Sequence, residues 1–491
     1  MNSQISRVAL AALAMLIALV VATTYWQTWA VAGLEDRQDN AIQRVAQFTI
    51  KRGVIYAGDG RTVLATNKQR RVKGRTFYFR RYPSRGLFAH TVGYATQQRS
   101  RVGLEQSLND YLTGANSNLN TVLNTTLDKL RGVTIKGNNV VLTVDPRAQR
   151  VALAALAGQC GAIFAVAPRT GAILVSASSP TYDPNAAERN FKLIERIRGA
   201  CNPASPLLNR ATNGRYVPGS TFKVVTAAAA IDSGRYSLAS TFNDLGYCIE
   251  YGRRVNNYDT STPFGFVNFV QAMQHSINSV FCDIGKKLGP QLLVEYTKRF
   301  GFYSPPPIET PSNERVASGL YRGGRLFEPK NPFQVDPGRL AFGQERLQVT
   351  PVQMAMVAAA VAAGGAVLRP HFVDRILATG GRVVTRTKPK ELRQAIKPST
   401  AAALTTMMEA VVSGGTGTAA QIPGIRVAGK TGTAETGVNG RNTTSFIAFA
   451  PVERPQVAIA VILENQSGTG GKTAAPIARI VMEALLRRGR T

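Results

Sequence analysis

The most specific motif of this chain is Pro218-Gly219-Ser220-Thr221-Phe222-Lys223. Its Pro-Gly pair is a helix-start signal, and the alanine-rich sequence that follows predicts a helix to about Ile231. Ser220 and Lys223 are three residues apart, so they share one face near the N-terminus of that helix. The stretch therefore predicts a hydroxyl and an amine one turn apart at a helix start.

A serine placed beside a lysine can act as a nucleophile without histidine. A lysine with its ordinary pKa of about 10.4 cannot accept a proton at neutral pH. Burial and a nearby cation lower that pKa, and a helix N-terminus favours negative charge developing on the serine. S-x-x-K occurs about twice by chance in a chain of this length, whereas here it occurs once, at a predicted helix start. The pattern favours Ser220 as a nucleophile activated by Lys223.

The second motif is Ser276-Ile277-Asn278. An asparagine amide can bond a substrate amide carbonyl, and a serine hydroxyl can relay a proton to a leaving amine. The spacing alone carries little weight, since Ser107-Leu108-Asn109 has it too. We discard that copy because it precedes the nucleophile and lies outside the α/β pattern that begins at about residue 160. His275 suggests a Ser-His pair with Ser276, but that pair is disfavoured because no acid is placed to orient the ring.

The third motif, Lys430-Thr431-Gly432-Thr433, lies on a predicted strand. Gly432 lets a peptide backbone approach the strand edge, and Lys430 and Thr433 suit a carboxylate. Backbone N–H groups of Ser220 and Thr433 can form an oxyanion hole. The ordered set S-x-x-K, S-x-N and K-T-G is much rarer than any one of its parts. The set closely resembles the motifs of penicillin-binding proteins and serine β-lactamases.

Residues 8–34 carry no charge and predict a membrane helix. At 1.5 Å per residue this length reaches about 40 Å, more than the roughly 30 Å of a hydrocarbon core. Tyr25, Trp26 and Trp29 follow the most apolar part as an interfacial belt. The segment is therefore expected to be an uncleaved single-pass anchor in the cell membrane.

The flanking charges predict the orientation of this anchor. Arg7 lies on one side, and Glu35 and Asp36 lie on the other, which places the N-terminus in the cytoplasm and the body of the protein outside. The alternative is a cleaved signal peptide with a small-residue site at Ala30-Val31-Ala32. In either case the body is exported.

The length and the charge limit the possible partners. A chain of 491 residues exceeds one compact core and predicts two or three domains. Lys+Arg 59 against Asp+Glu 29 gives +30, which suggests nucleic acid, an anionic membrane or another acidic partner. Residues 67–85 hold eight cations and no acid among aromatic residues. Export excludes DNA and RNA and leaves anionic lipid and wall polymers; the other interpretation is a solvated basic strand with its aromatics in the core.

No motif implies a metal, nucleotide or redox cofactor. The chain has only 3 histidines, and its 4 cysteines lack C-x-x-C spacing.

Alternating patterns predict short strands with glycine turns from 35 to 150 and an α/β texture from about 160. The later expected elements are strands over 161–166, 173–176, 427–432, 445–450 and 457–463, and helices over 269–288, 350–363 and 474–486.

Further motifs extend along essentially the whole chain. They are Arg52-Gly53-Val54-Ile55, Gly103-Leu104-Glu105, Tyr111-Leu112-Thr113-Gly114, Leu142-Thr143-Val144-Asp145, Ser179-Pro180-Thr181-Tyr182-Asp183-Pro184-Asn185, Asn202-Pro203-Ala204-Ser205-Pro206-Leu207, Asn209-Arg210-Ala211, Gly343-Gln344, Leu347-Gln348-Val349-Thr350-Pro351 and Phe446-Ile447-Ala448-Phe449-Ala450-Pro451. With these motifs, the chain resembles the class B penicillin-binding proteins, which are monofunctional D,D-transpeptidases. Within them it is most similar to the penicillin-binding protein A branch of actinobacteria.

The resemblance implies an α/β protein in three parts. Residues 1–34 would be a cytoplasmic tip and membrane anchor, and 35–150 a small, mostly-β, non-catalytic pedestal of the dimerisation type. Residues 151–491 would form the penicillin-binding domain, a mixed, largely antiparallel sheet flanked by helices.

The resemblance also implies the reaction. Ser220 would be acylated by the penultimate D-alanine of a peptidoglycan stem pentapeptide with loss of the terminal D-alanine, and an amine of a second stem would resolve the ester into a cross-link. β-Lactams would acylate the same serine. Glycosyltransferases and divisome or elongation proteins would be partners. The implied roles are Lys223 as base, Ser276 as proton relay, Asn278 as amide clamp, and Lys430, Thr431, Gly432 and Thr433 as the carboxylate-binding strand.

Two features of this chain differ from relatives: the residues Ser445-Phe446 and the spacing of the cysteines. Many relatives have Trp where this chain has Ser445-Phe446, which leaves the floor of the groove open. Four exported cysteines allow three full pairings. Cys160–Cys201 is the favoured bridge because both residues flank the entry to the catalytic sheet, and Cys282 is expected to be a buried thiol.

Three other functions remain open. A serine β-lactamase would lack the 35–150 module and would need an E-x-x-L-N loop, whereas the corresponding stretch, 305–311, is proline-rich. A D,D-carboxypeptidase would use the same chemistry with water as the acceptor. A non-catalytic scaffold for wall synthesis is disfavoured by the intact motifs.

Overall fold

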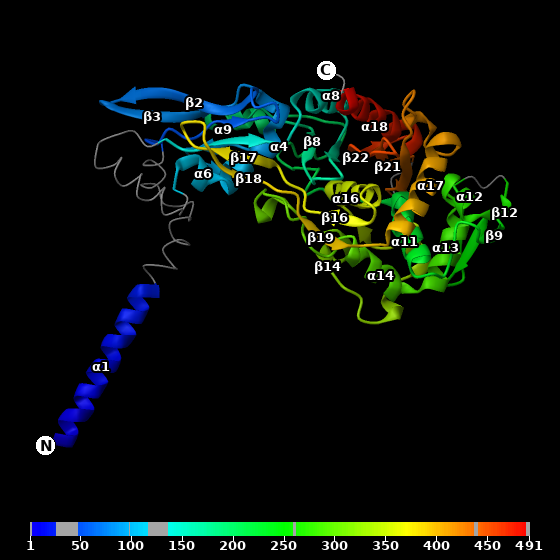
Figure 1. Cartoon of the computed structure of the whole chain (residues 1–491), viewed down its shortest axis with the longest axis horizontal. Helices are drawn as coiled ribbons and strands as arrows, with labels where there is room; N and C mark the ends of the chain where they lie inside the picture. The colour runs from blue at the N-terminus through cyan, green and yellow to red at the C-terminus, as the bar shows by residue number, and fades with distance from the viewer. Residues whose placement is uncertain are drawn as a thin grey trace.

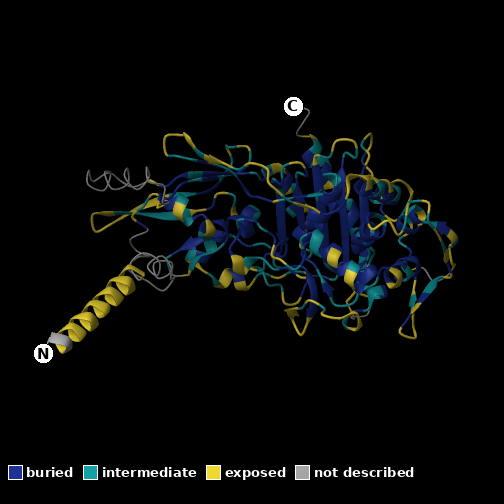
Figure 2. Cartoon of the chain, turned by 60° about the horizontal axis from the view of Figure 1, so that its bottom comes forward, coloured by how far each residue is buried: buried dark blue, intermediate teal, exposed yellow. Residues whose placement is uncertain are grey.

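The computed structural model describes residues 2–25, 48–97, 99–115, 136–258, 262–436 and 440–487. Helix α1 (Asn2–Tyr25) is exposed along its described side chains, and Figure 2 shows it as a yellow rod. From Gln4 to Tyr25 it is long and apolar enough to cross a membrane, by length and composition. Trp26, Trp29 and the small-residue site at 30–32 lie outside the described residues.

The larger core is a five-stranded antiparallel sheet in the order β20-β21-β22-β7-β8. Its strands are β7 (Gly161–Val166), β8 (Ile173–Ser179), β20 (Ala428–Glu435), β21 (Asn442–Ala450) and β22 (Val457–Gln466). Nearly all of their residues are buried because helices cover both faces (Figure 2). This is the predicted sheet of mainly antiparallel strands flanked by helices.

Alternate residues of β7 belong to two different cores. Ile163 and Ala165 pack with α8 (Pro146–Leu156) and α18 (Gly470–Leu486) on one face of the sheet. Ala162 and Phe164 face the opposite core, which contains the three helices α11 (Lys223–Asp232), α16 (Pro351–Ala362) and α17 (Pro398–Gly414) (Figure 1). Because the side chains of a strand alternate between faces, a strand buried on both sides reads as a continuous apolar run.

The N-terminal module is built on a six-stranded sheet in the order β18-β17-β6-β1-β2-β3. Its strands are β1 (Ile55–Tyr56), β2 (Val63–Val72), β3 (Arg75–Arg81), β6 (Asn139–Leu142), β17 (Val373–Leu377) and β18 (Val383–Arg386). The last two strands come from far along the chain, because β17 pairs with β6 (Ile376 with Val140). The mostly-β pedestal is therefore completed by a segment from beyond residue 370.

One predicted helix is broken in the structure. The expected helix over 269–288 consists of α12 (Phe269–Gln274) and α13 (Asn278–Leu288), with Ser276 between them at φ +57°. A left-handed residue cannot continue a right-handed helix. The helical periodicity of the sequence does not reveal a single residue of this kind, so the prediction of one helix was wrong.

The remaining described elements are short. They are η2 (Arg85–Phe88), α4 (Ala89–Val92), β4 (Ala95–Thr96), β5 (Ser100–Arg101), α5 (Leu104–Ser107), α6 (Asn109–Thr113), α9 (Pro184–Arg189), α10 (Lys192–Glu195), η3 (Gly219–Phe222), β9 (Thr241–Asp244), β10 (Tyr247–Glu250), β11 (Arg253–Asn256), β12 (Gly265–Asn268), α14 (Pro290–Arg299), η4 (Ser312–Glu314), β13 (Gly319–Arg322), β14 (Arg325–Leu326), η5 (Pro332–Gln334), α15 (Pro337–Ala341), β15 (Leu347–Gln348), β16 (Ala366–Leu368), β19 (Glu391–Gln394) and η6 (Thr418–Ala420).

Candidate active site

Ser220 lies in the 3-10 turn η3, and α11 begins only at Lys223. A 3-10 turn has three residues per turn, so positions i and i+3 still face the same way. The turn requires Gly219, whose φ is +54° and where a Cβ atom would lie 2.7 Å from the carbonyl oxygen of Thr433. The serine is thus held tightly against the edge strand β20.

Ser220 opens onto a cleft of about 720 Å³ between the large sheet and the α12–α13 region. Seven of the lining residues belong to the three motifs or their immediate neighbours: Ser220, His275, Ser276, Ile277, Asn278, Thr431 and Thr433. The other lining residues are Asn257, Tyr258, Phe264, Phe342, Gln344, Thr416, Thr418, Ala419, Thr469, Gly471 and Lys472. The structure therefore brings the three predicted motifs together in one cleft.

Lys223 is fully buried, and its amine is held by the S-x-N motif. Its Nζ donates to the backbone oxygen of Ser276 at 2.6 Å, to the Ser276 Oγ at 3.2 Å and to the Asn278 Oδ1 at 2.7 Å. Burial, and secondly the charge of Lys430, hold the pKa of Lys223 well below its ordinary value. A neutral amine is the form that can accept a proton from a serine.

The hydroxyl of Ser276 lies between the two lysines. Lys430 Nζ donates to it at 2.9 Å, and Lys223 Nζ reaches it from the other side at 3.2 Å. The left-handed turn at Ser276 places both its hydroxyl and its carbonyl oxygen toward Lys223. This hydroxyl is therefore positioned to pass a proton between the lysines and an atom in the cleft.

Lys430 lies beneath the cleft and is not among its lining residues. Burial lowers the pKa of its amine to about 7. Its other contacts are the backbone oxygen of Thr431 at 3.0 Å and the hydroxyl of Thr431 at 3.4 Å. Thr431 and Thr433 line the cleft, whereas Lys430 lies behind them.

Gly432 is needed for contacts inside the protein. A Cβ atom there would lie 2.3 Å from the Oγ of Ser445 and 2.6 Å from the carbonyl oxygen of Pro218. The Ser445 hydroxyl donates to that same oxygen at 3.1 Å, two residues before the nucleophile. Ser445 therefore braces the Ser220 turn, whereas the next residue, Phe446, packs fully buried on the opposite face of the sheet. Neither residue lines the cleft, so the difference from relatives that have Trp at this position does not affect the lining of the cleft.

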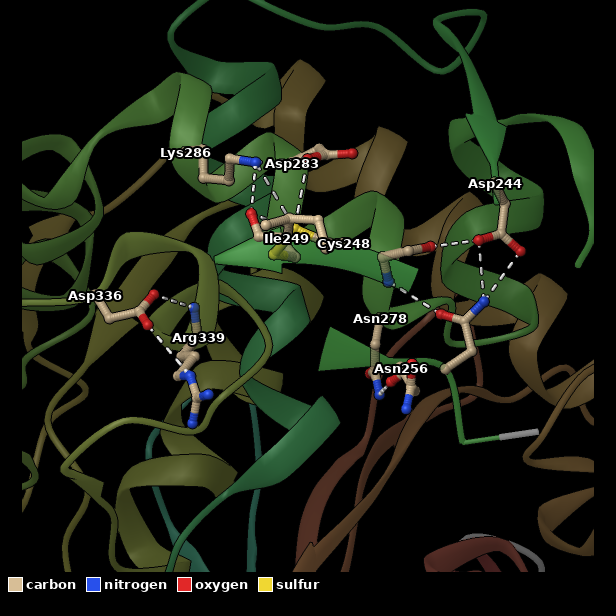
Figure 3. The surroundings of a disulfide bond; sticks show 12 residues. Asp244, Cys248, Ile249, Asn256, Asn278, Asp283, Lys286, Asp336 and Arg339 are labelled. Carbon is tan, nitrogen blue, oxygen red and sulfur yellow. Dashed lines mark hydrogen bonds and ion pairs between the residues drawn. A yellow bond between two sulfur atoms is a disulfide. The ribbon is translucent and has the colours of Figure 1, made fainter. Parts of the chain in front are cut away.

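Asn278 is tied to the β10–β11 hairpin, which directly precedes the lining residues Asn257 and Tyr258. Its Nδ2 donates to the carbonyl oxygen of Asn256 at 3.2 Å (Figure 3). Asn256 ends β11, which pairs with β10. Cys248 of β10 is bonded to Cys282, one turn beyond Asn278 on α13. A disulfide thus links the hairpin to the helix that carries the S-x-N asparagine.

The structure contains two disulfides. Cys160–Cys201 confirms the favoured pairing. Cys248–Cys282 contradicts the prediction that Cys282 is a buried thiol. The partners are 34 positions apart in the sequence, which gives no sign of their proximity; it arises because the β10–β11 hairpin folds back onto α13.

Removal of the Cys248–Cys282 bridge is expected to slow acylation of Ser220 by a penicillin. The double variant Cys248→Ser/Cys282→Ser releases the hairpin that holds Asn278, and we expect a rate about fivefold lower, together with a loss of about 2–4 kcal/mol in unfolding free energy. The matched control is Cys160→Ser/Cys201→Ser, which should lose similar stability while acylation stays at the wild-type rate. Equal acylation rates in the two variants would contradict a positioning role.

Sequence reasoning missed part of the cleft wall. Tyr258 and Phe264 line it, and Phe264 stacks on His275 with ring centroids 5.0 Å apart. The hydroxyl of Thr416 bonds that of Thr431 at 2.7 Å. Exposed Lys472 lies at the mouth, at the start of α18. No local pattern distinguishes these residues, because they come from separate loops and from the start of α18, which meet only in the folded chain.

Known proteins match this chain in both of its folded parts. The model of the "Penicillin binding protein transpeptidase domain" matches residues 161–483, and that of the "Penicillin binding protein A dimerisation domain" matches residues 52–140. The chain is 33% identical to the peptidoglycan D,D-transpeptidase PbpA of Mycolicibacterium smegmatis, with 100% of each chain covered. It is 34% identical to that of Mycobacterium tuberculosis, with 99% of each covered.

Solved structures show the same relationship. The ceftriaxone acyl-enzyme complex of penicillin-binding protein A from M. tuberculosis matches with a TM-score of 0.79 and 31% identity, covering 90% of this chain and 100% of that one. The D,D-transpeptidase domain of a peptidoglycan glycosyltransferase from Eggerthella lenta matches with a TM-score of 0.76 and 30% identity, covering 90% and 99%. The chain therefore belongs to the penicillin-binding protein transpeptidases.

Proposed function

We propose that this protein is a peptidoglycan D,D-transpeptidase that works through an acyl-enzyme on Ser220. The observation that carries the proposal is the convergence of two buried lysines, Lys223 and Lys430, on the Ser276 hydroxyl in the cleft that contains Ser220. This supplies an amine of lowered pKa and a proton relay beside a hydroxyl nucleophile.

In the acylation step, neutral Lys223 accepts the proton of the Ser220 hydroxyl as Oγ attacks the carbonyl carbon of the penultimate D-alanine. The backbone N–H groups of Ser220 and Thr433 stabilise the oxyanion. Ser276 then passes the proton to the leaving amine as the peptide bond breaks, which releases D-alanine and leaves an ester. An amine of a second stem attacks the carbonyl carbon of this ester, the bond between that carbon and Ser220 Oγ breaks as the new amide bond forms, and a proton from the amine returns to Oγ.

The substrate is held by groups with unused hydrogen-bonding capacity. Asn278 bonds Lys223 through Oδ1 and Asn256 through one amide hydrogen, so its second amide hydrogen is available for a substrate carbonyl. Thr431 and Thr433 bind the terminal carboxylate through their hydroxyls, and protonated Lys430 adds favourable charge beneath them. Gly432 permits the close packing of this strand against the Ser220 turn.

A labelled penicillin tests this function. The expected result is a long-lived adduct that peptide mass spectrometry places on Ser220. Rapid turnover of the penicillin would instead identify a β-lactamase, and the absence of any adduct would eliminate the acyl-enzyme proposal and leave a scaffold.

The choice between transpeptidase and carboxypeptidase needs both substrates together. A pentapeptide donor and an amine acceptor are expected to yield a cross-linked peptide and one D-alanine per link. Free D-alanine without a cross-linked product would make the protein a carboxypeptidase.

We infer that α1 is an uncleaved single-pass anchor with the N-terminus in the cytoplasm. Two disulfides in the body suit an exported, oxidising location. The intact mass of the protein extracted from membranes is expected to include residues 1–34, with the body open to protease from outside the cell. A mass that lacks about 32 residues would indicate a cleaved signal peptide.

We propose that the chain is divided into an anchor at 1–34, a pedestal at 35–150 and a catalytic domain at 151–491. Strands β17 and β18, although within the third range, belong to the pedestal sheet. Glycosyltransferases and division or elongation proteins are the proposed partners. Cross-linking in cells through the pedestal, followed by identification of the attached proteins, would test this, and capture of no wall-synthesis protein would count against it.

A further inference from the structure

The β2–β3 hairpin is the most basic exposed segment that the structure describes. It extends beyond the rest of the pedestal sheet, in blue at the left of Figure 1. The chain has no acidic residue between Gly60 and Gly103. Five exposed cations lie in the outer half of the hairpin: Lys68, Arg70, Arg71, Lys73 and Arg75. By contrast, the side chain of Arg80 is buried at the base of the hairpin, where it forms an ion pair with Glu105 at 2.6 Å.

The register of the hairpin divides these residues between two faces. Lys68 lies opposite Phe79, Arg70 opposite Phe77, and Val72 opposite Arg75. Directly opposed residues of an antiparallel pair project from the same face, and successive residues alternate between faces. We define the basic–apolar face as Lys68, Arg70, Val72, Arg75 and Phe77. The opposite face carries Gln69, Arg71, Thr76 and Tyr78.

We propose that this basic–apolar face rests on the anionic head groups of the membrane in which α1 is inserted. Cations beside exposed apolar side chains suit a lipid surface, since head groups attract the charges and the interface accepts the apolar groups. Val72 is 42% exposed and Phe77 is half-buried. The proposal rests on the anchoring of α1 proposed above.

The chain path supports the membrane as the anionic partner. The described body begins at Phe48, whose carbonyl oxygen accepts from Tyr78 N at 2.7 Å and whose ring lies 5.6 Å from that of Phe79. The chain therefore enters the body on this hairpin. The 22 residues between Tyr25 and Phe48 can span at most about 75 Å. The hairpin is thus the part of the body tethered directly to α1.

Charged residues on an edge strand also discourage pairing with other strands, so the experiment must isolate lipid contact. All native cysteines are in disulfides, so a single added cysteine takes a thiol-reactive dye selectively. The full chain is reconstituted in vesicles whose head groups carry a nitroxide quencher. The dye is placed at Val72→Cys on the basic–apolar face or at Gln69→Cys on the opposite face.

We expect quenching of the dye at position 72 to be about threefold stronger with one-third phosphatidylglycerol than with pure phosphatidylcholine, and to fall in about 0.5 M salt. The dye at position 69 should respond less. Lys68→Gln/Arg70→Gln/Arg75→Gln should abolish the difference between lipids. The matched control, Arg382→Gln/Arg386→Gln/Lys388→Gln, removes three exposed cations at the opposite edge of the sheet and should preserve it.

Equal quenching in both lipids, or equal losses in the two triple variants, would overturn the proposal. A response of the dye to soluble polyphosphate in phosphatidylcholine vesicles, equal to that with phosphatidylglycerol, would also overturn it in favour of wall polymer. Penicillin labelling of the same samples reports the proposed catalytic function separately. Release of the chain from the vesicles would identify failure of the anchor.

Discussion

Replacement of Lys223 by methionine is expected to lower the rate constant for acylation by a labelled penicillin about 10³-fold. Lys223 is fully buried, its amine bonds Ser276 and Asn278, and burial beside Lys430 keeps its pKa low. Methionine fills a similar volume without a base, so the loss should fall on proton transfer. The measurement is the time course of adduct formation over a range of penicillin concentrations, with Ser220→Ala as the zero reference.

The stability of this variant separates chemistry from folding. A buried amine is costly to desolvate, and methionine removes that cost, so the thermal midpoint of Lys223→Met should equal or exceed that of wild type. Lys472→Met is the matched control, because Lys472 lines the cleft but is exposed; its acylation rate should change less than threefold. A Lys223→Met protein that acylates at half the wild-type rate or faster would remove Lys223 from the role of base.

Replacement of Lys430 by methionine is expected to move the acid limb of the acylation pH profile to higher pH. Acylation requires neutral Lys223, a form that is populated above its lowered pKa and lost as pH falls through it. The charge of Lys430 is the second cause of that lowering, after burial. Without this charge the pKa of Lys223 rises, so less neutral amine is present at pH 7 and acylation there should fall about tenfold.

The measurement is the acylation rate constant between pH 5.5 and 9.5 in wild type and variant. Burial lowers the pKa of Lys430 itself to about 7, so the wild-type pair loses its protons in two linked steps. The variant should show a single step and should regain most of its rate at pH 9. An acid limb at the wild-type position, or a loss of rate that is equal at every pH, would show that Lys430 does not influence Lys223 through its charge.

The local pattern of apolar residues was sufficient to predict strands of the catalytic sheet. The expected strand over 161–166 coincides with β7, and the strands over 445–450 and 457–463 lie within β21 and β22. Strands buried on both faces give long apolar runs that stand out in the sequence. The three motifs were also visible, because their spacing is local: three residues in S-x-x-K, two in S-x-N, and adjacent residues in K-T-G.

Local pattern failed where one residue or one distant contact decided the conformation. The left-handed turn at Ser276 interrupts a region of helical periodicity, and its carbonyl and hydroxyl oxygens face Lys223 from 53 residues away in sequence. Lys430 is predicted to bind a carboxylate; its bond to the Ser276 hydroxyl was not predicted, because it depends on where β20 meets the α12–α13 turn. The disulfide of Cys282 with Cys248 was not predicted, because it depends on the folding of the β10–β11 hairpin onto α13.

The class of sheet, the three motifs and the apolar N-terminal helix could be predicted from local pattern, because each depends on residues close together along the chain. The sharing of one serine hydroxyl by two lysines, the disulfide behind Asn278 and the completion of the pedestal by strands from beyond residue 370 became visible only in the folded molecule. These features join segments tens to hundreds of residues apart. Local spacing carries no record of such contacts, which packing of the whole chain establishes.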